Sequence, residues 1–267
     1  MTAFFDYPGG AALGRVVPKS RIYEQAGANS ALKDLFAREV EQIVWRYKLA
    51  PETINLAATK AVSEIQIFTL ALKTAKPDED LLRAIDRAIP FPLLFELTFG
   101  GKRRVVAAYK RPSEADGAKW VTSAYYASDW TPDPVARSPL PVALDLAGLY
   151  EGMLGALLAG QRLEEDAACF GEAPQAGFLS APLAPALPIA EQIARHEAIS
   201  AGRRSVERIT ARLMREKQFH KRVAIHDELR AARGELVRLQ GASAPFPPAK
   251  PTISTAPDSH QDIYDHE

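Results

Sequence analysis

The sequence predicts an α+β fold: a mixed, mostly antiparallel sheet with packed helices, followed by a long C-terminal helix of coiled-coil type and a disordered tail. Strand-like alternation in the middle of the chain is flanked by helical periodicity, and residues 190–240 contain no proline while their charges alternate in sign. We therefore expect residues 1–16 to be a flexible N-terminus, 17–170 a globular α+β domain, 171–189 a linker, 190–240 the charged helical segment and 241–267 a disordered tail.

The first expected element is a helix over residues 30–47. Apolar residues recur there at helical spacing, and Ser30 can cap the first turn. Pro51 ends the helix, because proline cannot continue the hydrogen-bond ladder and keeps the preceding residue out of the helical region.

A central strand is expected over residues 62–72, because apolar residues occur on both of its faces. Gly100 and Gly101 predict a tight turn between two later strands. The further elements, in order, are a helix over 78–89 and strands over 93–99, 103–110 and 120–128. This order predicts a crossover helix followed by an antiparallel meander, with helices against one face of a mixed sheet.

The C-terminal half begins with a proline-rich loop over residues 131–141, and a helix over 142–158 should then pack on the sheet. Residues 171–188 are rich in alanine and proline, which is typical of a semi-rigid linker. Five prolines in residues 242–267 give the composition of a disordered tail.

Composition narrows the class of protein. The 267 residues are 47% hydrophobic with a formal net charge of zero, so the chain can bury a core and is not, as a whole, attracted to nucleic acid or anionic membrane. Residues 191–240 hold 12 Lys and Arg against 7 Asp and Glu, so the long helix is the basic part. The lone Cys169 excludes an intrachain disulfide and fits a reducing cytoplasm. We expect no signal peptide and no membrane span.

Six segments resemble a known family. They are VPKSRIY at 17–23, FAREVEQIVWRYKLAPETIN at 36–55, EIQIF at 64–68, IDRAIPFPLLF at 85–95, AYK at 108–110 and EKQFHKRV at 216–223. Together they resemble the prokaryotic family called domain of unknown function 4391, in the same order from about residue 17 to 239. The chain departs from the family pattern at His220 and His226, where asparagine is usual.

The resemblance implies a role near DNA processing. Members of such families resemble accessory genes encoded beside DNA methyltransferases and helicases of restriction or phage-defence type. This implication is an association between genes and specifies no mechanism.

A restriction-type nuclease would need acids that bind a divalent metal and a lysine two residues on. Glu64 and Gln66 on the central strand come nearest, with Glu39 and Glu96 as further acids, but Gln66 replaces the lysine. The structural explanation is that Glu64 and Gln66 lie at the solvent-exposed end of a strand and form hydrogen bonds with neighbouring backbone or helix groups. A divergent nuclease of the PD-(D/E)xK type therefore stays an alternative, and we assign no catalytic residue.

No metal or cofactor is expected. The histidines of the long helix do not fall on adjacent turns, and acidic residues beside Cys169 disfavour a thiolate. The Gly9-Gly10 and Gly100-Gly101 pairs open no strand-to-helix phosphate loop.

Basic residues on one strand pair could contact nucleic acid. The predicted turn is followed directly by Lys102, Arg103 and Arg104, and the second strand ends with Lys110 and Arg111. Such basic side chains can hold phosphates. Polar turns and lysine-rich edge strands explain the same residues structurally.

The long helix carries a narrow apolar stripe, which is typical of a docking or coiled-coil seam. The stripe consists of Val206, Ile209, Leu213, Phe219, Val223, Leu229 and Leu236. We expect a non-catalytic accessory subunit that docks onto a helicase or DNA methyltransferase of a restriction or defence system. A homodimer through the helix, or a self-associating DNA-binding module, is the further alternative.

Overall fold

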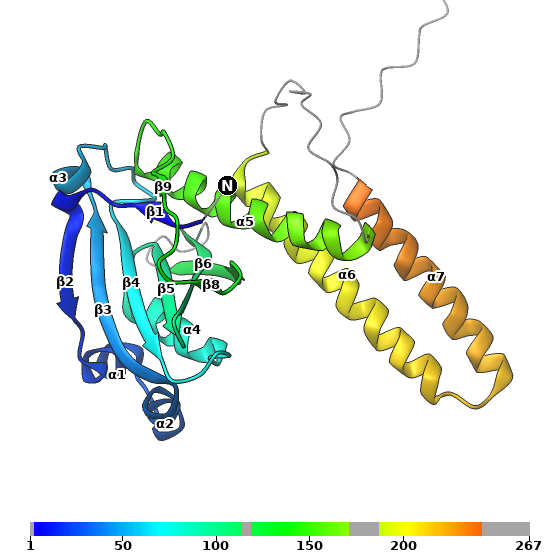
Figure 1. Ribbon diagram of the computed structural model, residues 1–267. Coiled ribbons are helices and arrows are strands. Elements are labelled where there is room, and N and C mark those ends of the chain that lie inside the picture. Colours follow the sequence, from blue (N-terminus) through cyan, green and yellow to red (C-terminus); the bar gives the residue numbers. More distant parts are fainter. Residues whose placement is uncertain (1–2, 114–118, 171–186, 242–267) are drawn as a thin grey trace, which may run out of the picture. The chain divides into compact units, whose positions relative to one another are not determined.

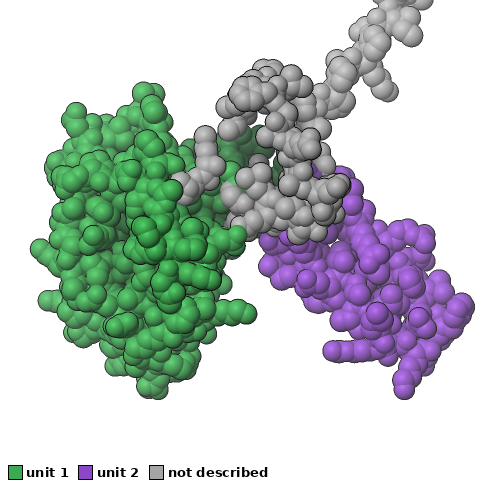
Figure 2. Space-filling model, in the orientation of Figure 1, with its two compact units in different colours: residues 1–181, 186–197 green, residues 182–185, 198–267 purple. Residues whose placement is uncertain are grey.

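The computed structural model describes residues 3–113, 119–170 and 187–241, with the side chains of 160–170 and 241 left aside (Figure 1). The chain divides into two compact units: unit 1 comprises residues 1–181 and 186–197, and unit 2 comprises 182–185 and 198–267 (Figure 2). The expected linker and tail fall largely on residues 171–186 and 242–267, which lie outside the described residues.

Unit 1 is built on one mixed, mostly antiparallel sheet of order β2-β3-β4-β5-β6-β7, with β8 added beside β6. Among the described strands of this sheet, only β4 and β5 are parallel neighbours, and they are joined by the crossover helix α4 (Glu79–Ala88). The strands are β2 (Ala12–Val16), β3 (Val40–Leu49), β4 (Ile65–Leu72), β5 (Leu93–Phe99), β6 (Lys102–Pro112), β7 (Trp120–Ala127) and β8 (Thr131–Pro132). The predicted central strand, crossover helix, turn and meander are therefore confirmed.

Helices cover both faces of this sheet (Figure 1). The chain's alternation of apolar side chains on β4 and β5 sends Phe68 and Phe95 to one face and Ile65 and Ile67 to the other. The helices of unit 1 are α1 (Lys19–Ala26), α2 (Ser30–Glu39), the short α3 (Pro51–Ile54), α4 and α5 (Leu146–Phe170). Helices α1, α2 and α4 pack on the Phe68 face, whereas α5 packs on the Ile65 face. The expectation that helices cover one face only is wrong, because both faces of the central strands are apolar.

Residues 3–16 are part of the fold, so the expectation of a flexible N-terminus is wrong for them. Strand β1 (Phe5–Asp6) pairs in parallel with β9 (Ser138–Pro139), and a short 3-10 turn η1 (Gly9–Ala11) leads into β2. Phe4 and Phe5 are each 3% exposed, because they pack into the core on the α5 side. Burial of these two rings stabilises the N-terminal segment by roughly 1.5–3 kcal/mol per side chain.

The predicted helix over 30–47 is correct only as far as Glu39, and its second half is strand β3. The register of β3 on β4 shifts between Val40 and Gln42 and again between Trp45 and Tyr47. Such bulges interrupt the two-residue alternation of a strand. Val40 and Ile43 are therefore both buried three residues apart, which imitates the spacing of a helix.

Unit 2 is an antiparallel helical hairpin, not one long helix. Helix α6 (Ile189–Arg215) and helix α7 (Phe219–Gly241) are joined by residues 216–218, although no proline breaks the sequence. The seam holds Ile209, Ile225 and Leu229, with Val206 and Leu213 partly buried against them. Arg212 pairs with Glu228 across the hairpin. The first turns of α6 belong to unit 1, where Ile189 and Ile193 join the core.

The two edges of the main sheet end in different ways. All five residues of β2 are exposed, its register on β3 shifts between Ala12 and Arg15, and Gly14 between them has a φ of 61°. A positive φ favours glycine there. At the other edge, the Ala124 amide of β7 donates a 3.3 Å hydrogen bond to Glu197 of α6.

One close approach fixes the loop before α5. A Cβ added to Gly152 would lie 2.8 Å from the Cβ of Pro141, whereas one added to Gly155 would meet no atom within 4 Å. The proline-rich segment therefore seats its ring directly on the helix at Gly152.

Candidate functional site

The acids that sequence reasoning grouped as a nuclease alternative lie apart. Glu39 accepts hydrogen bonds from Arg38 Nη2 at 2.8 Å and from the amide of Asp78 at 2.7 Å, at the start of β3. Glu64 lies at the opposite end of the β3–β4 pair, roughly 30 Å away at about 3.3 Å per residue. There it pairs with Lys48 at 3.3 Å and accepts a hydrogen bond from Gln66.

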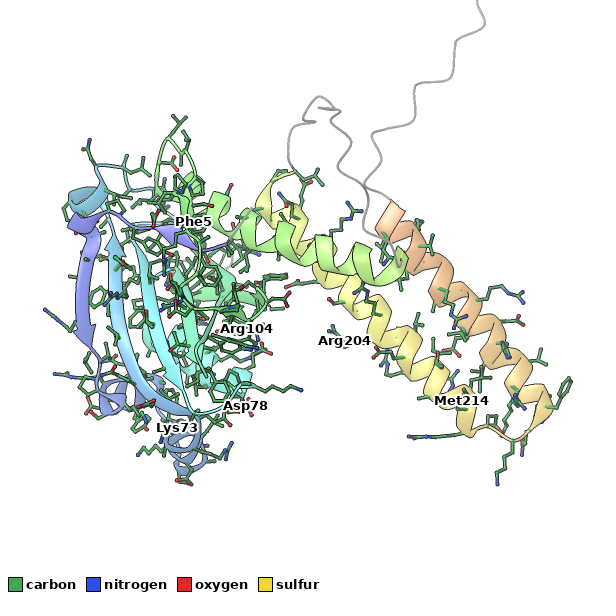
Figure 3. The ribbon with its side chains drawn as sticks, in the orientation of Figure 1. Phe5, Lys73, Asp78, Arg104, Arg204 and Met214 are labelled. Atoms are coloured by element: carbon green, nitrogen blue, oxygen red, sulfur yellow. The ribbon has the colours of Figure 1, made fainter. Side chains whose placement is uncertain are left out.

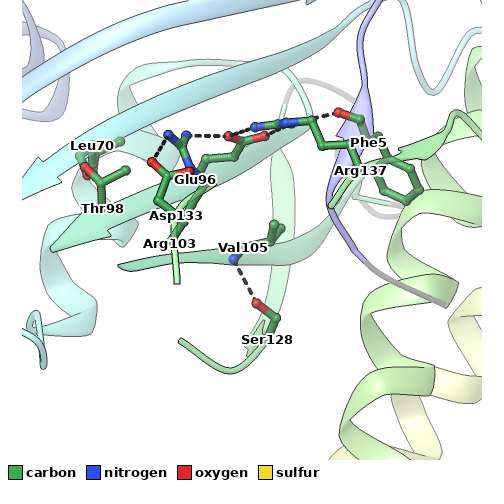
Figure 4. Close-up of polar contacts among 9 residues, drawn as sticks. All are labelled: Phe5, Leu70, Glu96, Thr98, Arg103, Val105, Ser128, Asp133 and Arg137. Atoms are coloured by element: carbon green, nitrogen blue, oxygen red, sulfur yellow. Dashed lines mark hydrogen bonds and ion pairs between the residues drawn. The ribbon is translucent and has the colours of Figure 1, made fainter. Parts of the chain in front are cut away.

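Glu96 lies on the other face of the sheet from Gln66, because it shares its side of β5 with Leu94 in the α5-side core. Its side chain is 2% exposed and is held by two arginines (Figure 4). Arg137 donates two hydrogen bonds to the carboxylate, at 2.9 and 2.8 Å, and Arg103 donates one at 2.9 Å. Arg137 also donates to the Phe5 carbonyl at 2.7 Å, so this cluster ties β1 to the sheet. We assign Glu96 a structural role.

The five basic residues predicted to contact nucleic acid do not form one patch. Lys102 and Lys110 are roughly 26 Å apart along β6, at about 3.3 Å per residue. Arg103 pairs with Asp133 at 3.0 Å as well as with Glu96, and Arg104 lies 5.3 Å from the centre of the Trp130 ring.

Lys110 is the clearest departure from the expected phosphate contact, because its side chain is only 3% exposed. Its ammonium donates hydrogen bonds to the carbonyls of Asp86 and Ile89, where α4 ends, and lies 3.5 Å from the Asp86 carboxylate. A cation satisfies the last carbonyls of a helix and its negative dipole end. Arg111 is half-buried beside it.

Asp86 and Tyr125 complete a buried network around Lys110. The Tyr125 hydroxyl donates to Asp86. Burial lowers the pKa of Lys110, against the raising effect of Asp86, and burial raises the pKa of Asp86, against the lowering effect of Lys110. Burial and the Asp86 charge together raise the pKa of Tyr125, which keeps its hydroxyl protonated as a donor.

A bulge arranges the strands around this network. The register of β6 on β7 shifts between Ala108 and Lys110, where two steps on β6 face three on β7. The shift places Trp120, Thr122 and Tyr125 on the side of Lys110.

Side-chain hydroxyls form hydrogen bonds with the backbone amides and the carbonyl that lack a strand partner at the bulge. The Tyr150 hydroxyl of α5 accepts from the Lys110 amide at 3.0 Å and donates to the Ala108 carbonyl at 2.7 Å. The Ser123 hydroxyl accepts from the Tyr109 amide at 2.9 Å. The bulge is therefore held from both sides by defined hydrogen bonds.

A cavity of about 340 Å³ opens over the network. Two arginines of α4, Arg83 and Arg87, lie at its wall, and Lys110 lies at 5.9 Å from the centre of the Trp120 ring. The remaining lining residues are Asp86, Pro90, Thr122, Ser123 and Tyr125. Sequence reasoning missed this site because its parts come from three elements. The signal available was the basic stripe of α4, with arginines four residues apart.

The apolar stripe predicted on the long helix is divided by the hairpin. Ile209 and Leu229 are buried in the seam, and a Cβ added to Gly202 would lie 3.2 Å from Leu236, so these residues serve the contact between α6 and α7. Phe219 and Val223 are 81% and 46% exposed. The predicted seam is therefore largely internal to the hairpin.

The turn between α6 and α7 carries large apolar side chains in solvent. Met214, labelled in Figure 3, is 83% exposed at the end of α6. We define the hairpin tip as residues 214–223, which hold four basic residues (Arg215, Lys217, Lys221 and Arg222) against one acidic residue, Glu216. Met214 was not included in the predicted apolar stripe, because its position does not follow the spacing of the other stripe residues.

Within the described residues, no group of three or more His, Cys, Asp and Glu side chains lies close enough to hold a metal ion. His196 is 9% exposed and packs edge-on against the Tyr126 ring at 5.9 Å. The side chain of Cys169 lies outside the described residues. No helix in the described part of the chain has the length and apolar character to cross a bilayer.

The fold and these features define an α+β protein with a cationic and aromatic pocket and a C-terminal helical hairpin. The chain belongs to the family described as Domain of unknown function (DUF4391), whose model matches residues 5–236. The resemblance seen in the sequence is thereby confirmed. Comparison with curated proteins and with solved structures found no match.

Proposed function

We propose that the protein is a non-catalytic accessory subunit that docks through its hairpin tip onto an acidic surface of a larger DNA-processing protein. The observation that carries the proposal is the exposure of Met214 and Phe219, 83% and 81%, on either side of a basic turn. The association expected for the family, beside helicases and DNA methyltransferases of restriction or defence systems, supports the kind of partner and a cytoplasmic location.

The chemistry of the tip favours protein docking. A methionine adapts its shape to an irregular apolar pocket, and aromatic residues are frequent anchors of interfaces. Burying each of these two side chains contributes roughly 1.5–3 kcal/mol to binding before the cost of association. The surrounding charge of four basic residues against one acidic residue is complementary to an acidic rim.

The internal seam explains why the tip, and not the whole helix, is the docking element. The contact between α6 and α7 takes up four of the seven stripe residues, namely Val206, Ile209, Leu213 and Leu229. Of the four large apolar side chains that are exposed in the described part of unit 2, three lie at the hairpin tip (Met214, Phe219 and Val223).

The test uses the full-length chain. We would replace Met214 by Ser and Phe219 by Ala together, and recover bound proteins from the native host beside the wild type. Val237→Ala is the matched control, because Val237 is 66% exposed on α7 but lies outside the tip. The recovered helicase or methyltransferase is then purified and its affinity for each variant measured.

We expect the double variant to weaken that affinity at least about tenfold, corresponding to about 1.4 kcal/mol, with the control unchanged. Charge reversal at Lys217 and Lys221 should weaken it further at low salt. Equal affinity of the wild type and the double variant would contradict the proposal. Recovery of DNA alone, with no protein partner, would favour the DNA-binding alternative.

A further inference from the structure

We propose that the cavity between α4, β6 and β7 is a binding site for a nucleoside phosphate, with Arg87 holding the phosphate and Trp120 facing the base. This inference concerns unit 1 and does not depend on docking by the hairpin. Its cavity of about 340 Å³ falls within the range of small-molecule sites.

Among the described residues that line the cavity, the charge balance leaves one cation for a ligand. Lys110 and Asp86 neutralise each other at the floor of the cavity, and Arg83 pairs with Glu79 at 2.6 Å. Arg87 is exposed and makes no ion pair within the described part of the chain. A guanidinium in this state matches the geometry of a phosphate, to which it donates paired hydrogen bonds.

Beside the Arg87 guanidinium, the cavity also has an apolar part, formed by ring-shaped side chains. Pro90, Trp120 and Tyr125 give the cavity flat apolar surfaces beside the cation. Stacking of a base on an aromatic side chain contributes about 1–3 kcal/mol and tolerates any base. A ligand that is flat and apolar at one end and anionic at the other fits both features, and nucleoside phosphates have this form.

The site is built rigidly enough to be specific. Lys110 donates hydrogen bonds to two carbonyls at the end of α4, and the Tyr125 hydroxyl donates to Asp86. These buried hydrogen bonds fix the floor of the cavity. The bulge that presents Trp120 and Thr122 is itself held by the Tyr150 hydroxyl. The two arginines of α4 are exposed, so they can adjust to a ligand.

A neighbouring hollow of about 450 Å³ shares Arg83 and Arg87 but is a poorer candidate. Its charged lining residues are Arg38, Asp78 and Asp80 besides the two shared arginines, and none of its described lining residues is aromatic. Of the two hollows, only the cavity beside β6 and β7 therefore offers, among its described lining residues, an aromatic surface next to the arginines.

The experiment measures binding to the full-length protein by calorimetry and by quenching of tryptophan fluorescence. The probes are adenosine monophosphate, inorganic phosphate and a short 5′-phosphorylated single-stranded oligonucleotide. Arg87→Ala tests the phosphate contact. Arg46→Ala is the matched control, because Arg46 is an exposed arginine on β3, three strands from β6 in the same sheet. Trp120→Phe keeps an aromatic ring while removing the reporter.

We expect the mononucleotide to bind and quench fluorescence, Arg87→Ala to weaken binding about tenfold or more, and Arg46→Ala to leave it unchanged. Trp120→Phe should abolish most of the quench while retaining the heat of binding. Binding of the oligonucleotide alone, with the same dependence on Arg87, would identify a strand terminus as the source of the nucleotide. Binding of inorganic phosphate as tightly as the nucleotide would refute the role of Trp120. No binding of any probe, or binding insensitive to Arg87→Ala, would overturn the proposal.

Discussion

Replacing Arg137 by methionine should destabilise unit 1 substantially, because it removes most of the support of a buried carboxylate. Arg137 donates two hydrogen bonds to Glu96, at 2.9 and 2.8 Å, and one to the Phe5 carbonyl at 2.7 Å. Methionine retains the aliphatic volume of the arginine stem, so the change tests the polar contacts more than the packing.

The magnitude follows from these contacts. Hydrogen bonds to charged groups contribute about 1.5–3 kcal/mol each, so the two on Glu96 set an upper range of about 3–6 kcal/mol. Two facts reduce it: the Arg137 side chain is 25% exposed, so water replaces part of its hydrogen bonding, and Arg103 still holds the carboxylate. We expect a loss of about 2–4 kcal/mol in the free energy of unfolding.

Urea unfolding followed by tryptophan fluorescence is the appropriate assay. The three tryptophans, Trp45, Trp120 and Trp130, all belong to unit 1, so the signal reports that unit alone. Glu79→Gln is the control, because it breaks an ion pair whose side chains are 54% and 49% exposed and should cost less than about 1 kcal/mol. If Arg137→Met costs no more than this control, the reasoning about Glu96 is refuted.

Three further predictions concern pH, the hairpin and the loop before α5. Burial raises the pKa of Asp86 above its ordinary 3.8, so between the unfolded and folded pKa values the folded state binds more protons, and stability is lost as pH rises through that window. Asparagine does not titrate, so Asp86→Asn removes this loss. The difference in urea midpoint, variant minus wild type, should therefore rise as the pH rises above 3.8. If the urea midpoints of the two proteins run parallel over pH, this prediction is contradicted. Leu229→Ala should cost about 2–5 kcal/mol of hairpin stability, seen as faster amide exchange in α6 and α7, whereas exposed Val237→Ala should change it by less than about 0.5 kcal/mol. Gly152→Ala should destabilise unit 1 by about 1–2 kcal/mol, because the new methyl overlaps a proline ring by more than the helix gains, whereas Gly155→Ala in open space should stabilise it by up to about 1 kcal/mol; equal urea midpoints for the two variants would show that the proline moves aside.

The central sheet could be predicted because its signals are local. The alternation of apolar side chains on β4 and β5 and the Gly100-Gly101 turn each lie within one short segment. Strand β3 could not be recognised from spacing, because its two bulges put Val40 and Ile43 three residues apart on the buried side. Its β-branched and aromatic residues were the better signal.

The hairpin turn gave no sequence signal of the usual kind. Residues 216–218 contain neither proline nor glycine. Instead, Glu216 accepts a 2.8 Å hydrogen bond from the Gln218 amide, which competes with helical hydrogen bonding at that point. The helices pair because Ile209 and Leu229 can bury each other only if the chain turns back.

The role of Lys110 was hidden for a different reason. On its own strand it resembles any basic residue near the end of a hairpin. Its partners, the carbonyls of Asp86 and Ile89, lie 24 and 21 residues away, and nothing local encodes their approach. The cavity built on this contact is visible only once α4 and β6 are brought together.

Both edge strands of the main sheet carry a feature that opposes pairing with a strand of a second copy. Unpaired strand edges are templates for adding further strands, and proteins block them with bulges or covering groups. The bulge and positive φ at Gly14 disrupt the regular row of donors and acceptors on β2, and Glu197 occupies the Ala124 amide of β7. Growth of the sheet from one molecule to the next is therefore opposed at these two positions, one on each edge strand, because a second copy would meet an irregular backbone at β2 and an occupied donor at β7.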